Sequence, residues 1–211
     1  MKIGILGAGN VGGELGRLWA AKGHEIVFGV PDPNKPAVAT LVQRIGGRAR
    51  AASVSAAATF GEVVVLAVPW PAAEQAIRSA GDLGGKTLID CTNPLSADIS
   101  GLTVGTSDSA GEQVCRWAKG AHVVKAFNTI GAPNFANPRF GEASASMFIA
   151  GDDGPAKAVV SRLAAELGFD VVDTGPLKTA RWLEGVGMLW IHLAFGQGWG
   201  PASHGFKLLR R

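Results

Sequence analysis

The stretch KIGILGAGNVGG, residues 2–13, decides how this chain folds. Its first part, Lys2–Leu6, is a short apolar run typical of a buried strand, and Gly7, Gly9 and Gly12 follow it at the spacing G-x-G-x-x-G. In a strand–loop–helix unit, the first glycine permits a tight turn, the second lets a pyrophosphate approach backbone N–H groups, and the third lets the helix pack closely. Three glycines that serve only a turn are the alternative, but the position between a strand and a helix favours a dinucleotide loop.

Beyond this loop, short strand-like runs alternate with longer helical stretches. Residues 11–22 carry apolar side chains at helical spacing, and residues 25–28 form the next strand pattern. The alternation continues with helices at 37–45, 53–60, from about 71, 109–119 and 155–167, and with extended runs at 48–50, 63–68, 87–90, 122–127, 146–150 and 169–172. Such alternation requires right-handed crossovers. We therefore predict an α/β fold with a doubly wound, mostly parallel sheet, the Rossmann NAD(P)-binding fold.

The last part of the chain departs from this rhythm. Residues 178–195 predict one long helix rich in Leu, Met and Trp. We expect a single domain over residues 1–211, with the sheet and its helices up to about residue 175 and a C-terminal helical extension over 176–211. This helix carries more apolar surface than a lone flanking helix needs, so we expect a homodimer. Trp190 and His192 could line an acceptor pocket, but a core or dimer position is favoured.

Composition excludes several function classes. The chain has no tyrosine, so it cannot use a Tyr–Lys general acid, and two cysteines are too few for a disulfide framework or a zinc dehydrogenase design. A net charge of +3 is too small to indicate nucleic acid. No basic stretch leads into a long apolar one, and residues 186–195 are far short of the roughly 20 needed to span a membrane. We expect a cytoplasmic protein without membrane or nucleic-acid partners and without a metal site.

Residues 29–35 follow the second predicted strand. In dinucleotide-binding folds this segment normally contacts the adenosine ribose. No acid stands at the strand end and no arginine follows it. Asp32 could contact the ribose and Lys35 a phosphate, but both could equally be solvated turn residues around Pro31 and Pro33. The choice between the two dinucleotides stays open on these residues.

Three further predicted strands end in polar or rigid residues, where ligands of such folds bind. These ends are Ala67-Val68-Pro69-Trp70, Cys91-Thr92-Asn93-Pro94-Leu95 and Ala126-Phe127-Asn128-Thr129-Ile130. Thr92, Asn93 and Asn128 can hydrogen-bond a carboxamide or hydroxyl without adding charge. Turn formation is the alternative, most credible for Asn93 before Pro94. Cys91 is expected to be a small buried hydrophobe rather than a nucleophile.

Several motifs together resemble a known family. They are ILGAGNVG at 5–12, AVPW at 67–70, VVKAFNT at 123–129, AGDD at 150–153 and DTGPL at 173–177. The combination resembles the NADP oxidoreductases dependent on the deazaflavin coenzyme F-420. It is also similar to the cytosolic NADPH-binding domain of the six-transmembrane metalloreductases. The resemblance covers nearly the whole chain and implies direct hydride transfer between a nicotinamide and a flavin-like ring stacked on it.

The resemblance also implies site residues and a cofactor. It places phosphate-loop contacts on Ala8, Gly9, Asn10 and Val11, later contacts on Val68, Pro69, Asn93 and Ala126, and NADP as the cofactor, with NAD as an alternative. Where the deazaflavin enzymes read the 2′-phosphate with a threonine and a Ser-Arg pair, this chain has Ala8, Val30 and Pro31 and keeps only Lys35. Where they carry a histidine, it has Asn128, as in the metalloreductase motif.

We therefore expect an NAD(P)H-dependent oxidoreductase with a flavin or deazaflavin acceptor and no catalytic acid, since positioning supplies most of the catalysis in such chemistry. Two alternatives stay open: a β-hydroxyacid or imine dehydrogenase that acts as an oligomer, and a non-catalytic NAD(P)H-binding module. The predicted cofactor-binding residues are Gly7, Ala8, Gly9, Asn10, Val11, Gly12, Val30, Asp32, Lys35, Val68, Pro69, Trp70, Asn93, Pro94, Ala126 and Asn128. The acceptor pocket is expected between the C-terminal helix, Trp70 and Asn128.

Overall fold

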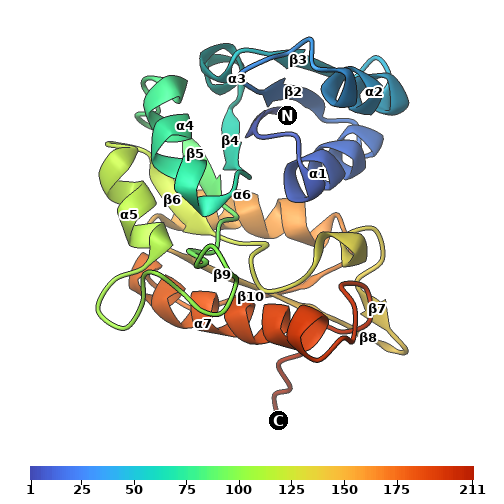
Figure 1. Ribbon diagram of the computed structural model, residues 1–211, viewed down its shortest axis with the longest axis vertical. Coiled ribbons are helices and arrows are strands. Elements are labelled where there is room, and N and C mark those ends of the chain that lie inside the picture. Colours follow the sequence, from blue (N-terminus) through green and yellow to red (C-terminus); the bar gives the residue numbers. More distant parts are fainter.

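The computed structural model describes residues 1–211 and has an eight-stranded sheet at its centre (Figure 1). In spatial order the strands are β10 (Asp170–Asp173), β9 (Ser146–Gly151), β6 (His122–Lys125), β5 (Thr87–Asp90), β4 (Val63–Leu66), β1 (Lys2–Leu6), β2 (Glu25–Gly29) and β3 (Ala49–Ala52). All neighbouring strands are parallel except β6 and β9. The predicted mostly parallel, doubly wound sheet is confirmed.

The reversal at β9 has a local cause. No helix connects β6 to β9; the chain passes instead through a 3₁₀ turn (Ala132–Asn134) and a short hairpin of β7 (Arg139–Phe140) and β8 (Ala143–Ser144). A parallel neighbour needs a crossover connection, usually an α-helix, whereas here the chain turns back without one and β9 pairs antiparallel with β6. The sequence reading did not find this hairpin.

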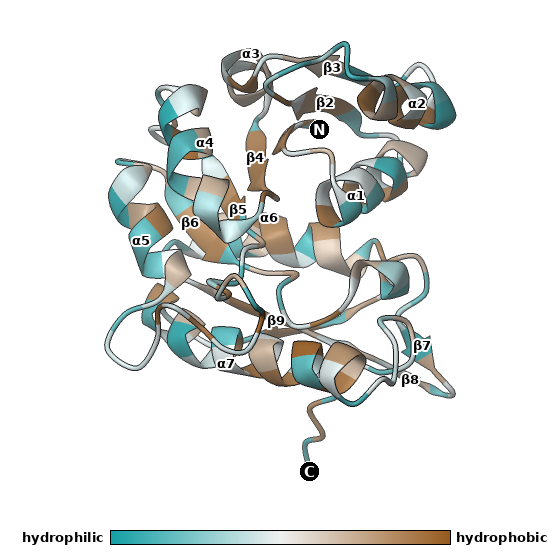
Figure 2. Cartoon of the chain, viewed as in Figure 1, coloured by the Kyte–Doolittle hydropathy of each residue, from teal (hydrophilic) through white to brown (hydrophobic).

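Helices cover both faces of the sheet. One face carries α1 (Asn10–Ala21), α2 (Pro36–Ile45) and α6 (Gly154–Ala165) over a core of 27 residues that includes Trp19 and Phe28. The other carries α3 (Val54–Phe60), α4 (Ala73–Ala80) and α5 (Ala110–Trp117) over a core of 15 residues. Figure 2 shows the hydrophobic strands between helices with hydrophilic outer faces. Side chains that alternate along each buried strand supply both cores.

The predicted C-terminal helix over 178–195 consists of three consecutive helical segments, of which only the middle one is an α-helix. A 3₁₀ turn (Leu177–Thr179) precedes α7 (Ala180–Ile191), and a π-helical turn (His192–Gly196) ends it. Gly198 and Gly200 then have φ values of 70° and 85°, in the left-handed region that ends a right-handed helix. Figure 1 shows α7 crossing the lower part of the molecule, and it packs on α5. None of the helices has the length and apolar character that a bilayer crossing requires.

Candidate functional site

The ends of five strands meet at one edge of the sheet. The parallel register places Leu6 beside Gly29 and Leu66, Leu66 beside Asp90, and Asp90 beside Lys125. The residues that follow these strands therefore leave the sheet together: Gly7, Val30, Ala67, Cys91 and Ala126. This carboxyl edge is where open α/β sheets bind ligands.

The glycine loop after β1 has a distinct steric reason for each glycine. Gly7 has φ +108°, and a Cβ there would lie 2.4 Å from the Ala67 carbonyl oxygen. A Cβ on Gly12 would lie 2.5 Å from the Gly7 oxygen. A Cβ on Gly9 would meet nothing within 4 Å, and Gly9 lines the cavity described below. Gly7 and Gly12 thus permit the turn, whereas Gly9 leaves room for a ligand to approach the backbone.

The start of α1 suits an anion. Gly9 caps this helix without a side chain to accept the first N–H groups, and no acidic residue lies in its first turn. By contrast, Ser53, Ser109 and Asp153 accept from the first turns of α3, α5 and α6. The free N–H groups and the positive end of the helix dipole favour a phosphate at α1. The residues present therefore fit a pyrophosphate.

A cavity of about 840 Å³ opens beside this loop, within the size range of small-molecule sites. It joins the phosphate loop, α1 and α2 to the loops after β5 and β6 and to the C-terminal segment. Of the predicted residues it brings together Ala8, Gly9, Asn10, Val11, Asn93 and Asn128. Its other lining residues are Gly13, Glu14, Ala37, Leu41, Arg44, Cys91, Phe127, Ile130, Gly131, Ala132, Pro133, Trp190, Ile191, Phe195 and Pro201.

The remaining predicted residues do not line this cavity: Gly7, Gly12, Val30, Asp32, Lys35, Val68, Pro69, Trp70, Pro94 and Ala126. Asp32 uses one carboxylate oxygen to accept the Asn34 N–H, as a turn residue does. Trp70, which was expected to border the acceptor pocket, is not among the residues that line this cavity. Its ring stacks on Trp117 of α5 with centroids 5.3 Å apart, so it has an apolar partner away from the cavity.

The C-terminal segment forms the opposite wall. Trp190 is 5% exposed, which agrees with the buried position favoured from the sequence. It also lines the cavity. Its indole N–H donates to the His204 carbonyl oxygen at 3.1 Å, and its ring stacks on the His204 ring. These contacts fix the Trp190 ring in the cavity wall. His192 lies outside the cavity lining.

Asn93, in the loop after β5, and Asn128, in the loop after β6, hydrogen-bond each other. Asn128 Nδ2 donates to Asn93 Oδ1 at 3.0 Å and to the Leu183 oxygen at 3.1 Å, and Asn93 Nδ2 donates to the Asn128 oxygen at 2.9 Å. Gly187 of α7 lies so close that a Cβ there would be 2.7 Å from Asn93 Oδ1. Asn128 Oδ1 is buried and accepts no hydrogen bond, the one such side-chain atom in the chain.

The backbone is strained at the same place. Phe127 has φ +61°, a left-handed conformation that costs about 1 to 3 kcal/mol for a residue with a side chain. The Phe127 N–H meets Met147 Sδ at 3.1 Å, and its ring packs edge-on against Trp19, Phe135 and Phe169. Aromatic packing thus holds the turn that carries Asn128 toward Asn93.

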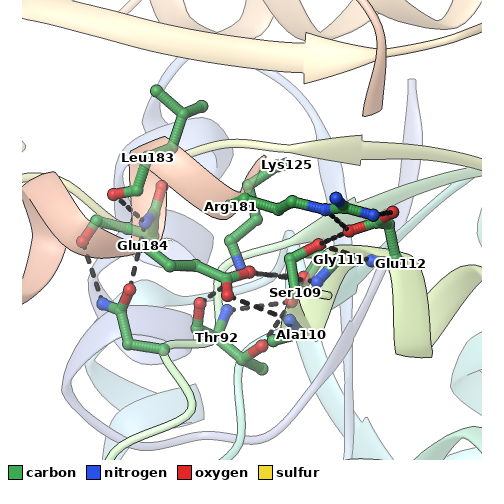
Figure 3. Close-up of polar contacts among 12 residues, drawn as sticks. Thr92, Ser109, Ala110, Gly111, Glu112, Lys125, Arg181, Leu183 and Glu184 are labelled. Atoms are coloured by element: carbon green, nitrogen blue, oxygen red, sulfur yellow. Dashed lines mark hydrogen bonds and ion pairs between the residues drawn. The ribbon is translucent and has the colours of Figure 1, made fainter. Parts of the chain in front are cut away.

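A buried ion cluster that includes Lys125 and Glu184 (Figure 3) lies next to Asn128, whose side chain donates to the oxygen of Leu183, the residue before Glu184. Lys125 Nζ is 2.9 Å from Asp90 Oδ2 and 2.9 Å from Glu184 Oε1, and all three side chains are at most 1% exposed. The third Lys125 N–H donates to the Thr92 oxygen at 2.5 Å. The cluster connects β5, β6 and α7, the same three segments that contribute Asn93, Asn128 and Gly187.

Every charge in the cluster has further partners. Asp90 Oδ1 accepts from the N–H and hydroxyl of Thr92, and Glu184 accepts from the Ala110 and Gly111 N–H groups at the start of α5 (Figure 3). Burial raises the pKa of Glu184. Burial alone would lower the pKa of Lys125, but the two carboxylates hold it above its ordinary value. The lysine therefore stays charged and orders the loops behind the cavity.

A second ion pair joins the same helices nearer the surface. The Arg181 guanidinium donates twice to Glu112, at 2.8 and 2.6 Å, and Ser109 donates to the same carboxylate (Figure 3). The Arg181 bond holds the pKa of Glu112 below its usual range. Burial raises the pKa of the Cys91 thiol, so this residue is an uncharged part of the cavity wall.

The sequence reading missed the ion cluster and Arg44. The signal for the cluster was present as charged residues inside apolar patterns: Lys125 within a strand, and Glu184 within the C-terminal helix. A buried charge needs a partner. Lys125 and Asp90, however, are 35 positions apart in the sequence, and no local periodicity shows that they pair.

Comparison with known proteins agrees with this architecture. The family model described as NADP oxidoreductase, coenzyme F420-dependent, matches residues 2–94. The structure of a candidate F420-dependent NADP-reductase from Arthrobacter sp. FB24 is 34% identical over the whole of both chains, with a TM-score of 0.90. Metalloreductase STEAP3 from Rattus norvegicus is 31% identical over 88% of this chain, which spans 36% of that relative. A reductive aminase from Aspergillus terreus in complex with NADPH is 19% identical, with a TM-score of 0.68 over 94% of this chain and 63% of the aminase, and shares the fold.

Proposed function

The chain belongs to the family of coenzyme F420-dependent NADP oxidoreductases, and on this premise we propose that it transfers hydride between NADPH and a flavin or deazaflavin ring in the cavity. The observation that carries the proposal is the cavity itself, which joins the phosphate loop to an apolar wall with Trp190 at its far side. A nicotinamide beyond the loop and a second flat ring against this wall could lie face to face, as hydride transfer requires.

The dinucleotide would lie across the carboxyl edge of the sheet. The uncapped start of α1 and the backbone at Ala8, Gly9, Asn10 and Val11 would bind the pyrophosphate. Val30, Asp32 and Lys35 follow β2 and would face the adenosine ribose, while Val68, Pro69 and Trp70 follow β4. Asn93, with Pro94, and Asn128, with Ala126, would flank the nicotinamide. NADP is the proposed cofactor, with NAD as an alternative.

The residues of the chain supply position rather than acid–base chemistry. Bound NADPH would supply a hydride, and an acceptor ring would be reduced by that hydride together with one proton from solvent. The cavity lining offers no acid with a free proton, because Glu14 is paired with Arg17 and the Cys91 thiol has a raised pKa. Asn93 and Asn128 orient polar ring substituents, and Trp190 and Phe127 exclude water.

Steady-state oxidation of NADPH in the presence of riboflavin, FMN and a deazaflavin tests the proposal, followed through the absorbance of the reduced nicotinamide. We expect turnover with at least one of these rings and none with a simple ketone or imine. Tight NADPH binding without turnover of any ring would contradict the enzyme and favour the nucleotide-binding module. Reduction of an imine alone would favour the dehydrogenase alternative.

We also propose that the protein is a homodimer. Trp182, Val186 and Leu189 of α7 and Leu193 of the π-helical turn that follows recur at helical spacing, and Trp182 and Leu189 are 71% and 50% exposed. Exposed apolar side chains in a continuous stripe mark an interaction surface. A second copy of the same helix is the simplest partner with a matching stripe.

A further inference from the structure

The buried ion cluster of Asp90, Lys125 and Glu184 contains two acids and only one base. All three side chains are at most 1% exposed, so dissolved ions screen their charges only weakly. No other charged side chain joins the cluster, because the remaining contacts are to Thr92 and to backbone N–H and oxygen groups. The net charge of the cluster is therefore set by the ionisation of the two carboxyl groups.

Both carboxyl groups have the contacts of carboxylates. Glu184 accepts from Lys125 Nζ and from two backbone N–H groups at the start of α5 (Figure 3). A proton on Glu184 would find no acceptor, because every partner is itself a donor. Burial raises the pKa of Glu184, but Lys125 and the Ala110 N–H act against that rise. Asp90 likewise accepts from Lys125 and from Thr92, so the cluster carries one net negative charge.

The cluster borders the cavity wall beside which the nicotinamide is proposed to lie. Asp90 is followed by Cys91, which lines the cavity, and the charge of Asp90 adds to burial in raising the pKa of the Cys91 thiol. Asn128, also in the lining, donates to the oxygen of Leu183, the residue before Glu184. None of the lining residues from the loops after β5 and β6 or from the C-terminal segment is charged. This wall therefore holds no cation that would offset the cluster.

We propose that the excess carboxylate of this cluster favours the oxidised nicotinamide over the reduced one, and so helps the hydride to leave. The inference rests on the proposed function, which places the nicotinamide beside Asn93 and Asn128. The ring of NADPH is neutral, and it gains one positive charge when the hydride leaves with both bonding electrons for the acceptor. A fixed negative charge in a dry wall stabilises that developing charge without having to reorganise. Asp90 and Glu184 touch no ligand and act only through their field.

A purely structural cluster is the alternative, since the same contacts join β5, β6 and α7. Structure depends on the shape and hydrogen bonds of Glu184, whereas the field depends on its charge. Two substitutions separate these properties. Glu184→Gln keeps the shape and removes the charge, and Glu184→Asp keeps the charge but is too short to retain every contact. A structural role predicts a similar effect of both variants, whereas the field predicts an effect of the first alone.

The experiment measures the dissociation constants of NADP⁺ and NADPH for the full chain by calorimetry, with no acceptor present. Glu184→Gln should raise the dissociation constant of NADP⁺ relative to that of NADPH about tenfold, as expected for one charge acting over roughly 10 Å at an effective dielectric constant of about 20. For a two-electron couple this factor raises the midpoint potential of the bound nicotinamide by about 30 mV. Asp90→Asn should shift the ratio in the same direction, and Glu184→Asp should leave it unchanged.

Glu74→Gln is the matched control. It removes the same charge from an exposed pair with Arg78 on α4, where solvent screens the field, so the ratio should not change. If neither Glu184→Gln nor Asp90→Asn folds, the parent decides. It should bind NADP⁺ more tightly than NADPH at both low and high salt, because the buried charge is weakly screened, and a preference for NADPH would overturn the inference.

A folded Glu184→Gln variant with an unchanged ratio would also overturn the inference, as would a Glu184→Asp variant that shifts the ratio equally. Either result would leave a structural cluster and would not affect the proposed hydride transfer, which is tested separately by turnover with flavins. A parent that binds neither dinucleotide would overturn the inference together with the proposed function.

Discussion

At the scale of single residues, two glycines of one loop have opposite tasks. Gly12 has no room for a Cβ because the Gly7 oxygen would lie 2.5 Å away, whereas Gly9 faces open space. Loss of Gly12 therefore damages the fold, and loss of Gly9 damages only the ligand site. This separates a structural requirement from a functional one within the same motif.

Gly9→Val should lose NADPH binding while the fold survives. The added side chain would occupy the space in which the pyrophosphate approaches the backbone, and we expect an affinity loss of at least about tenfold. Calorimetry with NADPH and a thermal melt on the same sample measure both effects. Gly12→Val is the control and should lower the melting temperature. A Gly9→Val variant that binds NADPH as tightly as the parent would show that the phosphates lie elsewhere.

Lys125→Met should destabilise the protein by about 3 to 5 kcal/mol, because Asp90 and Glu184 would remain buried without their cation. Urea unfolding measures the loss. Lys157→Met is the control, since Lys157 pairs with the half-exposed Asp173, and it should cost about 1 kcal/mol or less.

The stability of Lys125→Met should also depend on pH differently from that of the parent. Burial raises the folded-state pKa of Glu184 above its unfolded value, so protonation favours the folded state, and this contribution is lost as pH rises through the folded pKa. Without Lys125 the pKa rises further. The difference in the free energy of unfolding between variant and parent should therefore become smaller from neutral to mildly acidic pH. A difference that does not change with pH would mean that Glu184 does not carry the uncompensated charge.

At the scale of elements, α7 has two faces with different roles. Its inner face carries Leu183, Glu184, Gly187 and Trp190 against the site, and its outer face carries the apolar stripe. The sequence indicated the apolar character of this segment but not which face was covered. The inner face depends on Lys125 and Asn128, which are distant in sequence, so local periodicity could not distinguish the faces.

Leu189→Glu should convert a dimer to a monomer. A charge placed in an apolar interface without a partner should weaken association by about a hundredfold. Analytical ultracentrifugation at micromolar concentration measures the mass of parent and variant. The exposed Gln75→Glu, which adds the same charge on α4, is the control. A parent protein that is monomeric at this concentration would contradict the proposed homodimer.

The sheet was predictable from sequence because most of its strands follow one local rule. Continuous apolar runs followed by a helix give parallel strands buried on both faces, which held for β1, β2, β4 and β5. The hairpin before β9 obeys no such rule, and the reversal of β9 depends on the missing crossover helix. Residues of the cavity wall were predictable in the glycine loop and directly after β5 and β6, and unpredictable where, as for Arg44, packing of distant elements forms the wall.

At the scale of the whole molecule, cations are distributed unevenly between the two ends of α2. Arg44 and Arg48 line a surface hollow at its C-terminal end, whereas the turn before it has only Lys35, beside Val30 and Pro31. A 2′-phosphate prefers a bidentate arginine, and a single flexible ammonium discriminates less well. We therefore expect NADPH to be accepted with only a small advantage over NADH.

Pro31→Arg should then strengthen NADPH binding selectively. Pro31 is exposed and directly follows Val30 at the end of β2, so a guanidinium there can reach a ribose phosphate without displacing core residues. We expect a gain of roughly 1.5 to 3 kcal/mol for NADPH if the new charged hydrogen bonds form, and no gain for NADH. Dissociation constants of both dinucleotides for the parent and the variant measure it. Lys35→Gln should remove the small advantage of the parent, because no other cation lies in that turn. If the parent already prefers NADPH by about three orders of magnitude, or roughly 4 kcal/mol, the residues that bind the 2′-phosphate must lie elsewhere than after β2.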